Sequence, residues 1–434
     1  MKIKKRSIFI LLSVGILQAA GCGGGTDQSG QCGQDELLTE HLISVDSANS
    51  DLHTDNNGLP LWENGDSGRM PYSDIIAEQY QEIYHTVVKP DVTVTDDTES
   101  TRIIADVIQR LGEQGYTAID SKNQINMTKK EQVLQFYEAV EQKAESGLTI
   151  FVVAAPTRFT RYELTTANGE VVVTKGIYQY NNECFEKINE ISYVADSWQY
   201  TKEGYFIFTG SSYSEESYML TMSDVPEITA LRVEPLEERC KEYNECYISL
   251  IGYGRNNIFL CDWSEEDYGN LDFYDVFERF YPMYYQQPFP YVADENISVG
   301  TVYLIPEEEF ESVIGMHFSI DREALRSKAK YLPESRAYEY RPRGFYDAES
   351  PSIPYPEVVN YVSHADGTIT LTVNAVYPSE GTSKAYTHEV VVCPQGQDEF
   401  QYVSNMVLHS KDDYEMDWHT ERLTEEEWEK IYGQ

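Results

Sequence analysis

The chain has 434 residues, enough for two ordinary domains or three small ones, and it carries 73 acidic against 33 basic side chains. The formal net charge of −40 repels nucleic acid, and no basic patch with interleaved aromatic residues occurs, so we predict no nucleic-acid partner. The chain also holds 34 tyrosines, which suit half-exposed strand faces as well as surfaces that bind glycans or peptides.

The N-terminus reads as an export signal. Basic residues precede an apolar run over 8–17, which is too short to span a hydrocarbon core of ~30 Å. The following Ala19-Ala20-Gly21-Cys22 resembles the lipobox of bacterial lipoproteins. This resemblance implies a signal peptide over 1–21 and a diacylglycerol on Cys22, which would anchor the chain on the extracytoplasmic face of the cell membrane. The alternative is an ordinary secretory signal, with Cys22 an incidental thiol.

Residues 22–65 are polar, begin with a stretch rich in Gly, Ser, Gln and Asp, and show little periodicity. Such a composition is typical of a flexible tether without a fold of its own.

An N-terminal α+β domain is expected over 66–235. Apolar periodicity predicts helices over Tyr72–Val87, from about Thr98 to Gly112 or Gly115, and from a capping box at Thr128 to Gly147. The period then changes to two, and closely spaced strands with tight turns indicate an antiparallel meander. The predicted strands are Leu148–Ala155, Thr160–Thr166, Glu170–Tyr178, Ile191–Tyr200, Tyr205–Gly210 and Tyr218–Met222.

A C-terminal α+β domain is expected over 236–422. Helices are predicted over Leu271–Tyr281, over Pro306–His317 and from the cap Asp321 to about Lys330, followed by a loop over 332–357. Three alternating strands, Gly367–Tyr377, Ala385–Pro394 and Glu399–Leu408, would leave Thr368, Thr370 and Thr372 on the face away from the helices. A capping box at Thr424 and Glu427 predicts a short helix within 423–434.

If Cys22 is lipidated, six cysteines remain, at 32, 184, 240, 246, 261 and 393. Export permits disulfides, but the sequence cannot rank their pairing; Cys240 and Cys246 could close a small loop. The cysteine and histidine spacings give little support to a zinc site.

Calcium is the one cofactor that the sequence suggests, and only weakly. The segment Asp262–Asp272 supplies five carboxylates and an asparagine, although its order departs from an EF-hand loop. An acidic start of the helix after Asp272 explains the same residues. A second cluster, His409, Asp412, Asp413, Asp417 and His419, is a weaker candidate. Apart from this weak indication of calcium, we predict no metal site, no cofactor and no catalytic residue.

Two further patterns in the sequence have a possible role in catalysis or binding. Ser327-Lys328-Ala329-Lys330 fits the SxxK pattern of penicillin-interacting enzymes, but the partner motifs are missing, and a basic helix end explains it. The aromatic segment Phe280–Tyr291 favours a Pro-braced linker packed between domains, with an aromatic platform for a sugar or an extended peptide as the alternative.

The stretches DGTITLTVNAVYP (366–378), YTHEVVV (386–392) and FQYVSN (400–405) follow RPRGFYDAESPSIPYPEVV (341–359). With the lipoprotein signal, they resemble a family of uncharacterised lipoproteins from anaerobic Gram-positive bacteria, a domain of unknown function. The resemblance covers about 70–410 and implies no role for any residue other than Cys22.

The sequence therefore favours a non-enzymatic, lipid-anchored surface module that binds wall glycan, peptide or an envelope protein. One alternative is a cell-envelope hydrolase whose carboxylate pair is hidden among the many acids. Another is the solute-binding lipoprotein of an importer, although such receptors need two parallel βαβ lobes.

Overall fold

The structure is a computed structural model that describes residues 72–87, 97–181, 184–296, 299–396 and 399–433. All of them belong to one compact unit that covers Thr54–Gln434. The signal peptide, the tether and Cys22 lie outside the described residues. The expected α+β class with largely antiparallel sheets is confirmed, while the division at 235/236 into two domains stays a prediction.

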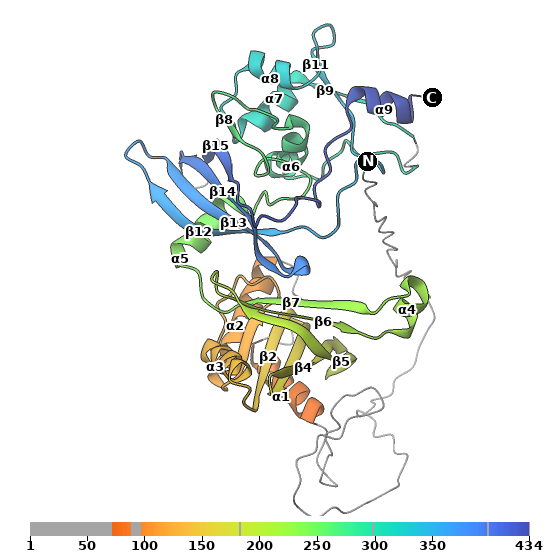
Figure 1. The fold of residues 1–434 in the computed structure, drawn as a ribbon. Coiled ribbons are helices and arrows are strands. Elements are labelled where there is room, and N and C mark those ends of the chain that lie inside the picture. Colours follow the sequence, from red (N-terminus) through yellow and green to blue (C-terminus); the bar gives the residue numbers. More distant parts are fainter. Residues whose placement is uncertain (1–71, 88–96, 182–183, 297–298, 397–398, 434) are drawn as a thin grey trace, which may run out of the picture. The chain divides into compact units, whose positions relative to one another are not determined.

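The N-terminal half is built on a seven-stranded sheet (Figure 1). Two predicted helices, α1 (Tyr72–Val87) and α2 (Asp97–Glu113), precede the short strand β1 (Thr117–Asp120), and α3 (Lys130–Glu141) follows it. The remaining strands are β2 (Ser146–Ala155), β3 (Arg158–Ala167), β4 (Glu170–Asn181), β5 (Cys184–Tyr200), β6 (Tyr205–Ser212) and β7 (Val225–Arg232). They follow one another in sequence order, and only β1 pairs in parallel, with β2.

Helices cover both faces of this sheet. On one face α3 buries Val133, Phe136 and Val140 against the strands. On the other face α1 brings Tyr80 onto Phe159 of β3, with ring centroids 3.9 Å apart. Alternate side chains of each strand therefore enter two different cores, as the period of two requires.

Two local predictions in this half are wrong. The segment expected as the strand Tyr218–Met222 is helix α4 (Glu215–Thr221), which buries no residue and leaves Met219 75% exposed. The Ser214 hydroxyl accepts a hydrogen bond from Ser217 N and so caps this helix. The capping box at Thr128 is absent, because α3 begins two residues later and the Thr128 hydroxyl donates to Tyr116 O instead.

The C-terminal half combines a five-stranded antiparallel sheet, a small three-stranded sheet and a helical layer. The first sheet has the order β12 (Tyr355–Ser363), β13 (Ile369–Tyr377), β14 (Thr382–Pro394), β15 (Phe400–Leu408) and β8 (Trp263–Ser264). Along β13 the side chains of Thr370 and Thr372 are half-buried between buried neighbours, so the predicted threonine face is confirmed at these two positions.

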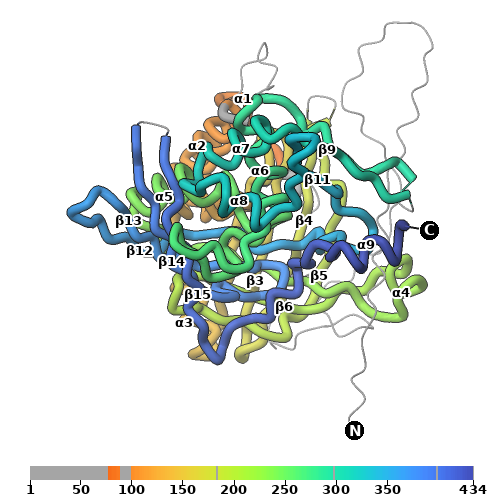
Figure 2. The backbone as a smooth tube through the Cα atoms, turned by 90° about the horizontal axis from the view of Figure 1, so that it is seen from above, coloured from red at the N-terminus to blue at the C-terminus, as the bar shows by residue number. Residues whose placement is uncertain are grey.

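The helical layer consists of α5 (Glu238–Tyr243), a π-helical turn Asn244–Ile248, α6 (Phe273–Tyr285), α7 (Glu307–Gly315) and α8 (Arg322–Lys328). Helices α6, α7 and α8 lie side by side, next to β9 (Tyr303–Pro306) and β11 (Ala337–Tyr340), in both views (Figure 1, Figure 2). Part of the loop predicted over 332–357 is thus ordered as β11, which pairs with β9 and with β10 (Tyr331–Leu332).

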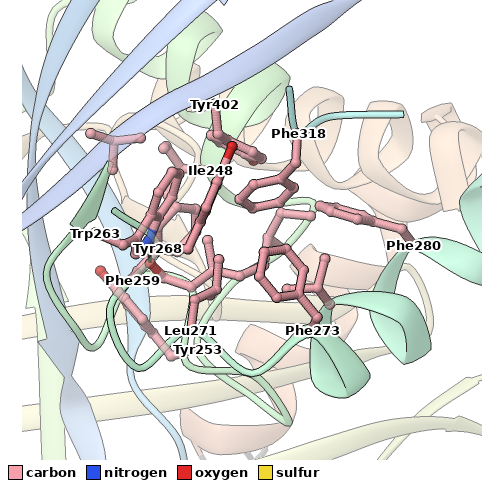
Figure 3. Packing of buried hydrophobic residues seen from close by; sticks show 14 of the residues in the cluster. Ile248, Tyr253, Phe259, Trp263, Tyr268, Leu271, Phe273, Phe280, Phe318 and Tyr402 are labelled. Atoms are coloured by element: carbon pink, nitrogen blue, oxygen red, sulfur yellow. Dashed lines mark hydrogen bonds between the residues drawn. The ribbon is translucent and has the colours of Figure 1, made fainter. Parts of the chain in front are cut away.

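An aromatic core holds this layer on the sheet (Figure 3). Phe280 of α6 and Phe318 lie 6.0 Å apart, and Phe318 in turn packs 5.8 Å from Tyr402 of β15. Tyrosine and phenylalanine rings therefore supply much of the contact between the helical layer and the sheet.

Helix ends follow the sequence closely in this half. Asp272 caps α6 by accepting hydrogen bonds from Tyr274 N and Asp275 N, and Asp321 caps α8 as predicted. The C-terminal helix α9 (Glu425–Tyr432) has the predicted capping box between Thr424 and Glu427. No helix among the described residues has the length and apolar character needed to cross a membrane.

Buried polar groups join the seven-stranded sheet to the five-stranded one. The Tyr205 hydroxyl of β6 donates to Glu357 of β12, whose carboxylate also lies 3.2 Å from Arg232 of β7. Asn123 donates to Ala230 O and to the Tyr355 hydroxyl. The two sheets therefore share one hydrogen-bonded network.

Candidate functional site

The aromatic segment singled out in the sequence lies in the chain between β8 of the five-stranded sheet and β9 of the three-stranded sheet. Its first half is the last turns of α6, which continue past Pro282 to Tyr285, and its second half runs back toward β9. The rings of this segment and of β9 form one array, which we call the aromatic strip: Tyr281, Tyr284, Tyr285, Phe289, Tyr291 and Tyr303.

Each ring of the aromatic strip contacts the next. The centroid distances are 4.8 Å for Tyr284–Tyr285 and 4.7 Å for Tyr285–Tyr281. The array continues over Tyr281–Phe289 at 5.4 Å, Phe289–Tyr291 at 5.6 Å and Tyr291–Tyr303 at 5.3 Å. These separations are those of favourable aromatic pairs, so the strip is an ordered surface.

One end of the aromatic strip faces solvent. Tyr284 is 44% exposed and Tyr285 is 37% exposed, whereas Tyr281, Phe289 and Tyr291 are half-buried. Val302 and Leu304, which flank Tyr303 along the chain, are exposed as well, but the alternation of side chains along a strand directs them to the opposite face from Tyr303. A contiguous apolar surface of this kind marks an interaction site more often than scattered exposed residues do.

A single carboxylate lies among these rings. Glu309 of α7 is half-buried and accepts a hydrogen bond of 2.7 Å from the Tyr291 hydroxyl. Burial, this hydrogen bond and the charge of Glu309 raise the pKa of Tyr291. Burial first and then the same carboxylate also raise the pKa values of Tyr281 and Tyr285. Glu309 therefore lies close to three tyrosines of the aromatic strip.

A second candidate is a cavity of about 180 Å³ beside α9. Ion pairs within the protein link the charged groups of its wall: Lys330 lies 3.0 Å from Glu339 and 2.5 Å from Glu425, and Arg341 lies 2.8 Å from Glu339 and 4.3 Å from the Trp428 ring. Such a wall docks α9 onto the protein, and its charges already have partners.

Two neighbouring carboxylates, those of Asp272 and Asp275, are candidates for a catalytic pair, and they lie near Arg422, which lines this cavity. Asp272 and Asp275 both face Arg422; burial and the charge of Asp275 raise the pKa of Asp272. Burial also favours the neutral form of Asp275, but Arg422 and Arg343 outweigh it and hold that pKa below its usual range. Asp275 is only 1% exposed, and both carboxylates already bind backbone N–H groups or arginines. This arrangement supports the fold, and the hydrolase alternative stays an untested prediction.

The predicted calcium segment places its acids apart. Asp262 accepts from Val407 N, Asp267 accepts from Gly269 N, and Asp272 caps α6. In the second cluster Asp413 accepts from Ser410 N, while His419 pairs with Glu349. Within the ranges that the structure describes, no group of three or more potential ligands has metal-binding geometry. Calcium binding stays an untested prediction.

Other singled-out residues have structural roles. The Ser327 hydroxyl donates to Ala324 O, and Lys330 belongs to the wall beside α9. Cys240 is a buried free thiol, so the small loop that it could close with Cys246 is not formed. Because the described strands pair antiparallel except β1 with β2, nothing in them supports the importer alternative, which needs two parallel lobes.

Sequence reasoning located the aromatic part of the site and missed its carboxylate. Glu309 stands in the run Glu307-Glu308-Glu309 in the first turn of α7, where acidic residues favour the helix dipole and need no further role. Only the folded chain shows the role of Glu309, because the packing of α7 brings residue 309 beside residue 291.

The comparisons with known proteins add a family but no activity. A family of unknown function (DUF6070) matches residues 71–422. No curated protein and no solved structure matches the chain. The comparisons therefore assign no residue role, and the geometry of the aromatic strip is what suggests a function.

Proposed function

Because the chain belongs to this family of unknown function over 71–422, we propose a function from its own residues: a non-enzymatic, lipid-anchored binding module of the cell surface, with the aromatic strip as its ligand site. The observation that carries the binding role is the unbroken contact of six rings, two of them open to solvent. Tyrosine offers a large apolar face and a hydroxyl at low entropic cost, which suits wall glycans and peptides alike.

The anchoring part of the proposal is supported by the sequence around Cys22. In the full chain, replacing Cys22 by alanine is expected to move the protein from the membrane fraction into the medium of a Gram-positive host, because the acceptor of the lipid is gone. Cell fractionation with immunoblotting measures this. A Cys32→Ala variant is the matched control and should stay in the membrane fraction. Equal partitioning of both variants would contradict lipid anchoring.

The binding part is tested by thermal unfolding of the chain without residues 1–21 and with Cys22→Ser, against muropeptides, wall glycans and short peptides. A ligand at 100 times its Kd stabilises the fold by about 2.7 kcal/mol, which shifts Tm by a few degrees. We expect one ligand class to give a saturable shift. The double variant Tyr284→Ala/Tyr285→Ala should weaken its binding at least about tenfold, because each exposed ring contributes roughly 1 kcal/mol.

The chain offers a matched control for this double variant. Tyr213 and Tyr218, beside and within α4, are also exposed and lie 5.8 Å apart as a ring pair. Replacing both by alanine removes another pair of exposed tyrosine rings, outside the aromatic strip, and should leave affinity unchanged. An equal loss of affinity in both double variants, or no loss in either, would show that the ligand binds outside the aromatic strip.

A further inference from the structure

The charge around the aromatic strip narrows the class of ligand. Glu308 and Glu309 begin α7 beside the strip, and Asp294 and Glu295 lie in the exposed segment that leads from Tyr291 toward β9. No ion pair among the described residues involves any of these four acids, whereas the neighbouring Glu307 is paired with Arg326 and Arg336. The strip is therefore flanked by negative charge that no cation of the described chain compensates.

Glu309 differs from an ordinary surface acid. Its carboxylate is half-buried and bonded to Tyr291, so it is partly desolvated while it remains without a cationic neighbour. The ring of Tyr281 lies 6.1 Å from that of Tyr291 and 4.7 Å from that of Tyr285. The faces of aromatic rings carry partial negative charge and attract ammonium groups within about 6 Å.

We propose that the aromatic strip binds an extended peptide through its lysine ammonium groups, with Glu309 as the counter-ion and Tyr281, Tyr285 and Tyr291 as the surrounding rings. The inference rests on the proposed binding function and specifies its ligand. An ammonium group meets both needs of the site at once, since it supplies the missing positive charge and packs its alkyl stem along the rings. A neutral sugar would satisfy the rings but leave the carboxylate uncompensated.

The probe is the peptide acetyl-Gly-Lys-Gly-Lys-Gly-amide, titrated into the chain without residues 1–21 and with Cys22→Ser. A second peptide carries norleucine in place of each lysine, which keeps the alkyl stem and removes the charge. We expect saturable calorimetric binding of the lysine peptide, at least about tenfold weaker binding of the norleucine peptide, and weakening of the lysine complex by salt.

The variant Glu309→Gln can still accept the Tyr291 hydrogen bond, so the fold should be retained. It is expected to lose about tenfold in affinity for the lysine peptide and to leave binding of the norleucine peptide unchanged. Glu216→Gln on the exposed helix α4 changes the net charge equally and should bind as the parent does. This control separates the local site from the attraction that a net charge of −40 exerts on any cation.

The outcomes separate the two proposals. If a neutral glycan binds and Tyr284→Ala/Tyr285→Ala abolishes it while the lysine peptide does not bind, the strip is a ligand site and the ammonium inference is wrong. If Glu309→Gln and Glu216→Gln weaken the lysine peptide equally, the inference is also wrong. If neither peptides nor glycans bind, both the ammonium inference and the proposed binding function are wrong.

Discussion

Replacing Asp275 by asparagine is expected to lower the free energy of unfolding by about 4 kcal/mol, because it removes the ion-pair partner of the buried Arg343 and leaves Arg422 with only Glu278 and Asp272. Asp275 lies 2.7 Å from Arg343 Nη2 and 2.5 Å from Arg422 Nη2 and is 1% exposed. Arg343 and Arg422 hold the segments around 341–347 and 420–423 against α6 through further bonds to backbone carbonyls. Urea unfolding at neutral pH measures the loss.

The matched control is Glu242→Gln, which removes one carboxylate from an exposed ion pair with Arg239 at 2.6 Å. Exposed pairs contribute between 0 and about 1 kcal/mol, so this variant should unfold within about 0.5 kcal/mol of the parent. Similar losses in the two variants would show that the Asp275 network is open to water and not a buried support.

The second large effect concerns His388, whose ring lies fully buried inside the five-stranded sheet. His388 lies in β14, and both nitrogen atoms of its ring have a hydrogen-bond partner. Its Nδ1 lies 2.7 Å from Asn405 Oδ1, and its Nε2 lies 2.9 Å from the Tyr253 hydroxyl. Since Asn405 Nδ2 donates to Cys261 O, Oδ1 is left to accept, which assigns the proton to Nδ1.

Burial lowers the pKa of His388 to about 4 from 6.5, and the hydrogen bond to Asn405 opposes this only in part. Between these two values the unfolded chain binds the proton and the folded chain does not. The uncharged His388 ring therefore makes its full contribution to the free energy of unfolding above about pH 6.5. About 3 kcal/mol of this free energy is lost as the pH falls to about 4.

Other acids titrate in the same window, so the measured quantity is the difference in unfolding free energy between the parent and His388→Gln at several pH values. The glutamine variant is less stable throughout, but the difference should shrink by about 3 kcal/mol between about pH 7 and pH 4. A difference that stays constant with pH would mean that water reaches the His388 ring.

Much of the fold could be predicted because local signals and packing agree. Helix α1 has the predicted bounds, since its periodic apolar residues meet a sheet face, and Asp321 and Thr424 cap helices where their spacing indicates. The antiparallel order of β2 to β6 follows from turns too short for any crossover.

Other elements depend on contacts that no short window contains. Strand β1 has four buried residues between two helices, and it exists because it pairs in parallel with β2. Around Tyr218, alternation suggested a strand, but no partner strand lies there, so the segment forms a capped helical turn at the end of a long hairpin. β11 was missed because its pairing partner β9 lies some thirty residues earlier.

The candidate site divides in the same way. Most of its rings come from one aromatic segment that the sequence singles out, although the sequence favoured a linker over a platform there. Glu309 could not, because its significance depends on which of three consecutive glutamates is oriented toward Tyr291 and which toward Arg336. A helix places neighbouring residues about 100° apart, so this choice is made by tertiary packing.

Strand β9 also bears on how copies of the protein behave toward one another. It is the outer strand of its sheet, has only four residues, and ends at Pro306, which has no N–H to offer. Three glutamates follow at once, so a second copy that approached this edge would bring its own glutamates against them. Short length, proline and like charge are the features that keep exposed edges from growing into intermolecular sheets. The protein can therefore display an apolar, aromatic surface at high local density and still resist self-association along this edge.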